Sequence, residues 1–239
     1  MPKEKVSYRV YQHTRVKHKI PFFGEDVYPV YITVTYGQRA LNFKSRLFES
    51  MAHSTAHKLV IPAPSVENIM KQEAQLVSFI VESLDANFSA DLFKKQYAFY
   101  TTNLLQELEE QVKEFLIGFF NREGMPSMAH LINTTSDDLS ADIIISELEK
   151  SLSPALVQNL MNDQFFKQVP YRPLKRFYES VSINDMPVLT AFNFSRKPFN
   201  EALSFFLLNE FPQYAGYDFE KWLANFSSTR SEKAMWKNA

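Results

Sequence analysis

Residues 28–46, which read YPVYITVTYGQRALNFKSR, decide the fold. Apolar side chains occupy every second position in the first half of this stretch: Tyr28, Val30, Ile32, Val34 and Tyr36. A period of two is typical of a strand with one buried face. Gly37 and Gln38 then form a Gly-X pair that suits a two-residue type II′ turn. The stretch is therefore predicted to form a β-hairpin.

This turn fixes the pairing and sorts the side chains onto two faces. The apolar face carries the pairs Val34–Leu41 and Ile32–Phe43, and the polar face carries Tyr31–Lys44 and Thr33–Asn42. A shift of one residue would mix the faces, so the register is well determined. Residues 6–11 repeat the alternation and predict a further strand, and residues 17–26 are expected to be a loop. The polar face and its continuation form the candidate binding surface: Arg9, Tyr11, His13, Arg15, Tyr31, Thr33, Asn42, Lys44 and Arg46.

The apolar pattern becomes helical after Pro64. Ser65 is a predicted N-cap for a helix with an apolar stripe over residues 69–84, and one long helix is expected over residues 89–119. Further helices are expected over residues 141–152, from Pro154, over 199–210 and over 217–226, while the pattern loosens beyond Pro173. The predicted fold is α+β, with a small N-terminal three-stranded antiparallel sheet followed by a mainly helical body. Residues 1–60 and 61–239 are its predicted domains.

The long predicted helix carries a wide apolar stripe: Phe93, Tyr97, Tyr100, Leu104, Leu108, Val112 and Phe115. One interpretation is that this stripe binds a second copy of the chain or another protein. The other is that it packs inside its own domain. Both stay open at the level of the sequence.

Composition narrows the class of protein. The chain has 239 residues, of which 45% are apolar, so it can bury a substantial core. Cysteine is absent, which excludes disulfides, thiolate metal sites and a cysteine nucleophile and favours a reducing compartment. The N-terminus has no apolar stretch typical of a signal peptide, and no apolar run reaches the roughly 18 residues of a membrane span. A soluble, cytoplasmic protein without a membrane partner is expected.

The charge is unevenly distributed. Residues 1–60 contain ten Lys or Arg against four Asp or Glu, a balance of +6, and the remainder contains sixteen against twenty-three, a balance of −7. This asymmetry favours a basic surface for a polyanion beside an acidic body. Alternatively, the two oppositely charged parts attract each other or a protein partner.

The N-terminal segment resembles a known family. A basic strand and a loop precede YPVYITV at residues 28–34, a Gly turn with Arg39 follows, and LNFKS ends the pattern at residues 41–45. This order resembles the N-terminal arm-type DNA-binding domain of phage and transposon tyrosine recombinases (integrases), over about residues 5–48. In that family the polar face of a three-stranded sheet lies in a DNA groove. The resemblance implies that the candidate binding surface contacts DNA, with Arg and Lys on phosphates and Asn on adenine.

The catalytic elements of that family are not recognisable. Recombinases need a tyrosine nucleophile, two arginines and a His-x-x-Arg element. His13 is followed by Arg15, two positions later, and three positions after His130 lies Asn133. Residues 61–239 also read as helical. Binding without strand transfer is therefore expected, and no enzyme activity is assigned.

Three other clusters contain residue types found in functional sites. His53 and His57 are one helical turn apart and can chelate zinc, but without Cys or a zincin Glu an exposed turn is favoured. Asp137, Asp138 and Asp142 can hold a divalent cation, although their place before a helix is more typical of capping. No metal or cofactor is predicted. A second basic cluster has two interpretations: it binds nucleic acid, or the aliphatic parts of its side chains pack over aromatic core residues. Its members are Lys167, Arg172, Lys175, Arg176, Arg196 and Lys197.

The sequence thus predicts a non-catalytic DNA-binding protein, an accessory or regulatory factor of a phage or mobile element. The alternative is a structural or interaction protein whose basic sheet docks an acidic partner. A third hypothesis is an enzyme with an unrecognised site.

Overall fold

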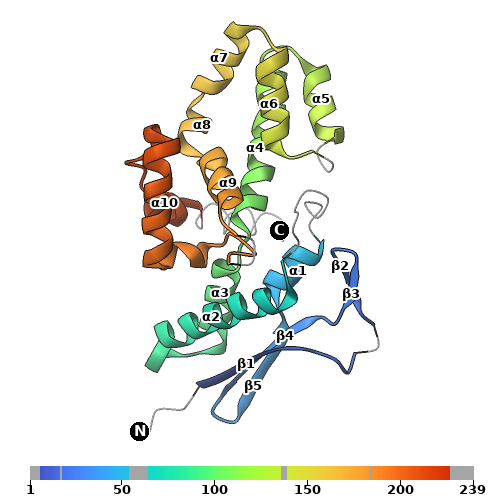
Figure 1. Ribbon diagram of the computed structural model, residues 1–239, viewed down its shortest axis with the longest axis vertical. Helices are drawn as coiled ribbons and strands as arrows, with labels where there is room; N and C mark the ends of the chain where they lie inside the picture. The colour runs from blue at the N-terminus through green and yellow to red at the C-terminus, as the bar shows by residue number, and fades with distance from the viewer. Residues whose placement is uncertain (1–5, 17, 54–63, 136–138, 183–184, 227–239) are drawn as a thin grey trace. The chain divides into compact units, whose positions relative to one another are not determined.

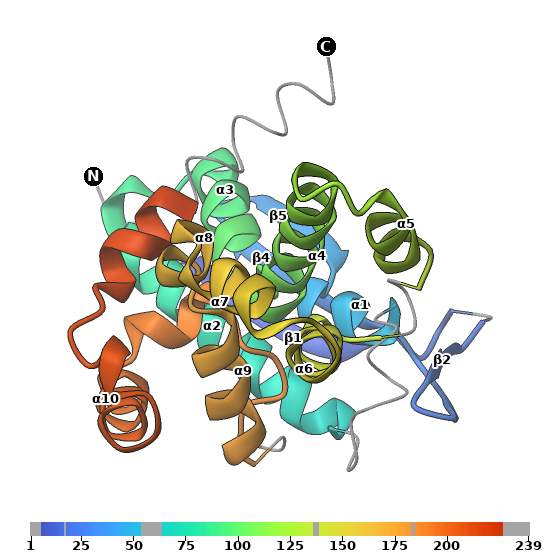
Figure 2. The ribbon, with the colours of Figure 1, turned by 90° about the horizontal axis from the view of Figure 1, so that it is seen from above.

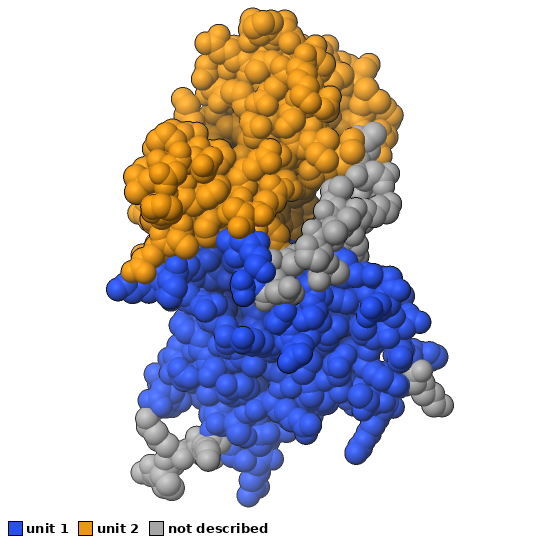
Figure 3. Space-filling model, in the orientation of Figure 1, with its two compact units in different colours: residues 1–103, 181–199 blue, residues 104–180, 200–239 orange. Residues whose placement is uncertain are grey.

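The computed structural model describes residues 6–16, 18–53, 64–135, 139–182 and 185–226 (Figure 1). The chain forms two compact units (Figure 3). Unit 1 consists of Met1–Asn103 and Val181–Phe199, and unit 2 of Leu104–Ser180 and Asn200–Ala239. The expected α+β class is confirmed, because an N-terminal antiparallel sheet precedes a mainly helical remainder.

The three-stranded sheet has the predicted register. Its strands are β1 (Val6–Gln12), β4 (Val30–Tyr36) and β5 (Arg39–Lys44), in the order β1-β4-β5 and antiparallel throughout. Tyr36 lies opposite Arg39, as the two-residue turn requires, and Gly37 has the positive φ, 53°, of that turn. Both faces of the hairpin are therefore as expected.

A second, small sheet replaces the loop that was expected over residues 17–26. Strands β2 (Ile20–Phe22) and β3 (Glu25–Val27) pair antiparallel across Phe23 and Gly24, which both have positive φ, at 50° and 88°. Phe22 is buried, and its ring stacks on Phe48 at 5.3 Å. The loop prediction is wrong, because the tight turn and this ring contact hold a short hairpin in place. Its strands have only three residues each, too few to show the alternation of apolar and polar residues by which a strand is predicted.

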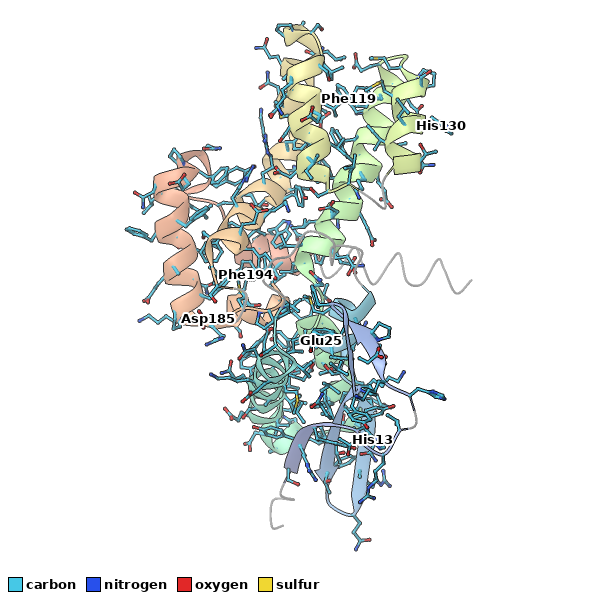
Figure 4. The ribbon with its side chains drawn as sticks, turned by 45° about the vertical axis from the view of Figure 1, so that its right-hand side comes forward. His13, Glu25, Phe119, His130, Asp185 and Phe194 are labelled. Carbon is cyan, nitrogen blue, oxygen red and sulfur yellow. The ribbon has the colours of Figure 1, made fainter. Side chains whose placement is uncertain are left out.

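The apolar face of the three-stranded sheet is covered by helices of unit 1. These are α1 (Arg46–His53), α2 (Val66–Leu84), which continues into the 3-10 turn η2 (Asp85–Asn87), and α3 (Ala90–Tyr100). Figures 1 and 4 show α2 and α3 on one side of the sheet. Val30, Ile32 and Val34 are fully buried in one core with the stripes of α2 and α3. The unit therefore extends well past residue 60, which differs from the predicted division into 1–60 and 61–239.

The segment 181–199 belongs to the same unit. It contains η3 (Ala191–Ser195), whose Phe192 is buried in the core of unit 1. The side-chain amide of Gln72 on α2 binds the backbone of Val188 twice, donating to its carbonyl at 2.8 Å and accepting from its N–H at 3.3 Å. These contacts join residues far apart in sequence.

The long helix expected over residues 89–119 is two helices, α3 and α4 (Leu104–Arg122). Between them, the hydroxyls of Thr101 and Thr102 donate to the carbonyls of Tyr97 and Ala98, at 2.6 and 3.1 Å, and Asn103 forms a β-bridge with Thr190. Hydroxyl bonds to preceding carbonyls compete with helix continuation. Phe93 and Tyr97 of α3 are buried in unit 1, and the stripe residues Leu104, Leu108 and Val112 of α4 are buried in unit 2. Tyr100 and Phe115 are half-buried, so the structure supports the interpretation as ordinary core for five of the seven stripe residues.

Unit 2 is helical throughout its described residues. It contains α4, α5 (Pro126–Thr135), α6 (Ala141–Ser151), α7 (Pro154–Asn162), α8 (Gln164–Gln168), α9 (Tyr171–Ser180), most of α10 (Lys197–Glu210), η4 (Pro212–Tyr214) and helical residues 219–226. Figure 2 shows α4 beside α5. Helix α9 lies where the apolar pattern loosens, and its Leu174 and Phe177 are buried. Among the described helices, none is both long and apolar enough to cross a membrane.

Candidate nucleic-acid interface

The polar face of the three-stranded sheet carries seven of the nine predicted binding residues. Arg9, Tyr11, Tyr31, Thr33, Asn42 and Lys44 lie on its strands, and His13 continues the pairing of β1, because its backbone N–H donates to the carbonyl of Pro29 at 2.9 Å. We call these seven the open face, since none of them is buried. Figure 4 shows His13 among the side chains of this sheet.

The register arranges the open face in rows across the strands. One row places Arg9, Thr33 and Asn42 side by side, and the next places Tyr11, Tyr31 and Lys44 side by side. Neighbouring rows are two residues apart, or about 7 Å along a strand. A polar row with one cation thus lies beside a row of two aromatic rings and a second cation.

Three rings form an aromatic cluster on this face: Tyr11, His13 and Tyr31. The ring centroids of His13 and Tyr31 are 5.1 Å apart, those of Tyr11 and His13 are 6.0 Å apart, and those of Tyr11 and Tyr31 are 6.5 Å apart. The guanidinium of Arg9 lies over the Tyr11 ring, 5.1 Å from its centroid. Nδ1 of His13 is buried and has no hydrogen-bond partner among the described residues.

The polar residues of the open face have partners of their own. Thr33 donates its hydroxyl proton to Oδ1 of Asn42 at 2.6 Å. Lys44 forms an ion pair with Glu49 at 3.4 Å, between side chains that are 50% and 37% exposed. An exposed pair of this kind contributes at most about 1 kcal/mol, so an incoming phosphate can compete for Lys44.

The other two predicted residues lie outside the strands. Arg15 is in the turn that follows β1, and Arg46 is the first residue of α1; both are exposed. The backbone N–H of Arg46 donates to the hydroxyl of Tyr97 at 3.0 Å. The predicted strand geometry therefore does not extend to Arg46, because the helix begins there.

Directly beneath the start of α1 lies a buried carboxyl group that was not predicted as a functional residue. Glu73 on α2 is fully buried and accepts hydrogen bonds from the hydroxyls of Ser45 and Tyr97, the latter at 2.6 Å. Ser45 also caps α1, since its Oγ accepts from the N–H of Phe48 at 3.0 Å. The cluster thus connects the end of β5 to α1, α2 and α3.

Burial raises the pKa of Glu73 from 4.5 to about 7. Hydrogen bonds from Ser45, Tyr97 and the backbone of Leu47, and the charge of Arg46, oppose the shift without cancelling it. Burial, followed by the adjacent Glu73, raises the pKa of Tyr97 well above 10. The sequence contains a signal for this residue, because Glu73 lies one helical turn from both Ile69 and Leu76 in the stripe of α2.

The second basic cluster is engaged with carboxylates in unit 2. Arg172 pairs with Asp142 at 3.3 Å and with Glu149 at 2.8 Å. Arg176 also pairs with Asp142, at 3.1 Å, and Lys175 pairs with Glu179 at 3.1 Å. These pairs neutralise the cations that lie in α9, which favours the structural interpretation of that part of the cluster.

Most residues of the two clusters that were weighed as metal sites lie outside the described part of the chain. Asp142 is an ion-pair partner of two arginines, whereas Asp137, Asp138 and His57 lie outside the described residues, as does the His53 side chain. Within the described residues there is no group of three His, Asp or Glu side chains that can hold a metal ion.

Comparison of the chain with protein-family models, curated proteins and solved structures found no match. The resemblance of residues 5–48 to integrase arm domains therefore stays a prediction.

Proposed function

We propose that this protein binds DNA through the open face and does not cleave or join it. The observation that carries the proposal is the charge of the sheet. Two cations of the strands, Arg9 and Lys44, lie on the open face, Arg39 lies at a register position of the other face, and β1, β4 and β5 contain no Asp or Glu. A polyanion meets attraction on such a surface without repulsion from the same strands.

The shape of the sheet supports the same proposal. The apolar face is covered by α2 and α3, while the residues of the open face are exposed or half-buried. A narrow antiparallel sheet fits the major groove of DNA, and Arg9 and Lys44 on this face are residue types that bind phosphates. The role of an accessory factor of a phage or mobile element rests on the resemblance alone.

The test is a salt series with a matched control. Replacing Arg9 and Lys44 together by Ala is expected to weaken DNA binding by a few kcal/mol at most. The slope of log K against log salt is negative, and each lost phosphate contact makes it less steep by about 0.9. Gel shifts or fluorescence anisotropy over a range of salt concentrations measure both effects.

Lys94→Ala with Lys95→Ala is the control, because it removes the same charge from exposed positions on α3. We expect it to retain the wild-type salt slope. Equal losses of DNA affinity in the two double variants would show that positive charge anywhere on the protein attracts DNA non-specifically. If the wild type did not bind DNA even at low salt, the alternative of an acidic protein partner would be favoured instead.

The chemistry of the proposal is tested separately. We expect no covalent protein–DNA adduct after incubation with nicked or supercoiled DNA, because no His-x-x-Arg element is present in the sequence. An adduct mapped to any tyrosine by mass spectrometry would contradict the non-catalytic role.

A further inference from the structure

The aromatic cluster lies on the face of the sheet that points away from the core. Tyr11 and Tyr31 are directly opposite each other in the register, and His13 packs against both rings. The apolar side chains of the same strands point to the other face, into the core. These rings are therefore not needed to fill the core of unit 1.

His13 argues against a purely structural cluster. Its Nδ1 is buried without a hydrogen-bond partner among the described residues, and an unpaired buried polar atom costs stability. A phenyl ring would fill the same space without this cost. Unsatisfied buried groups in a folded protein call for an explanation such as a functional role or a bound molecule.

The surroundings of the cluster define the chemistry of its ligand. Arg9 covers the Tyr11 ring with its guanidinium, and Lys44 lies opposite Tyr31 in the register. Each tyrosine of the cluster thus has a cation beside it, which matches a ligand that carries flat bases and anionic phosphates. Unpaired bases stack on tyrosine and histidine rings and on arginine planes.

The groups that read base edges in a duplex are engaged within the protein. Oδ1 of Asn42 accepts from Thr33, and the guanidinium of Arg9 lies over a ring. Bases in a duplex are stacked on each other and offer only their edges, whereas bases of a single strand offer their faces. Resting on the proposed function, we propose that the open face takes single-stranded DNA, with unpaired bases stacked on the aromatic cluster.

The experiment compares a short fluorescent single strand with the duplex of the same sequence, using the full chain. The single strand is expected to bind more tightly. Tyr31→Leu is expected to weaken that binding by about 5- to 150-fold, the usual contribution of one stacked base, and to leave duplex binding nearly unchanged. Tyr31→Phe, which retains the ring, should restore the wild-type affinity.

Tyr8→Leu is the matched control, because Tyr8 is a 38% exposed tyrosine on β1 at a position of the opposite face. We expect it to bind the single strand like the wild type. Circular dichroism checks the folding of each variant. One further measurement uses the wild-type protein and so does not depend on whether a variant folds. A single strand that carries 5-iodouracil should photo-crosslink to Tyr11, His13 or Tyr31.

The outcomes separate the two proposals. Duplex binding as tight as single-strand binding, or crosslinks that map only outside the aromatic cluster, would overturn the stacking proposal and leave DNA binding intact. Failure of both DNA forms to bind would overturn the proposed function itself.

Discussion

The wild-type protein is expected to lose about 3 kcal/mol of its free energy of unfolding as the pH rises from 4.5 to about 7, because of Glu73. The variant Glu73→Gln is expected not to show this loss. The folded state retains the proton of Glu73 up to about pH 7, whereas the unfolded chain releases it near pH 4.5. The folded state therefore binds more protons inside this window, and its free energy of unfolding falls as the pH rises. Above the window the loss from this group is complete.

Urea unfolding at a series of pH values measures the effect as the difference between wild type and variant, which removes the contributions of other titrating groups. Glu67→Gln is the matched control, since Glu67 is exposed on the same helix. It should retain the wild-type pH dependence. A wild-type curve that runs parallel to that of Glu73→Gln would show that the buried carboxyl group does not titrate in this window.

The features that sequence reasoning predicted are local. The hairpin of β4 and β5 follows from a period of two and one glycine turn, and the register then assigns every residue to a face. Ser65 accepts a hydrogen bond from a backbone N–H of the first helical turn, so the predicted cap is present, and Ser89 and Ser153 cap α3 and α7 in the same way. Such signals require only neighbouring residues.

The features that it missed depend on contacts between distant residues. Gln72 holds Val188, and Asn103 pairs with Thr190, so the segment 181–199 joins the unit that contains the sheet. No period or cap in the sequence reports such a pairing. The same reason explains the break between α3 and α4, where a continuous apolar stripe hides a change of unit.

The strand register of the candidate interface was predicted correctly, and the electrostatics of its residues were not. Seven of the nine residues share one face because the strand parity was correct. The ion pair of Lys44 with Glu49, the ring contacts of His13 and the burial of Glu73 require the packed structure. Charge counts along the chain could not show which cations are engaged by carboxylates, as in α9.

The largest loss of stability is expected for Phe93→Ala, at about 3–5 kcal/mol. Phe93 on α3 is fully buried. The centroid of its ring is 6.0 Å from that of Phe43 on β5 and 5.8 Å from that of Phe88. Truncation leaves a cavity between the helix and the sheet, which partial relaxation does not fill. Urea unfolding followed by circular dichroism measures the loss in free energy.

Leu92→Ala is the control, because Leu92 is the preceding residue of the same helix and is 44% exposed. It should cost much less. Hydrogen exchange adds a readout that bears on the division of the chain. If the sheet and α3 form one cooperative unit, Phe93→Ala accelerates exchange of the amide protons of β4 along with those of α3. If residues 1–60 were instead an independent domain, the amide protons of β4 would keep their wild-type protection while those of α3 lost theirs.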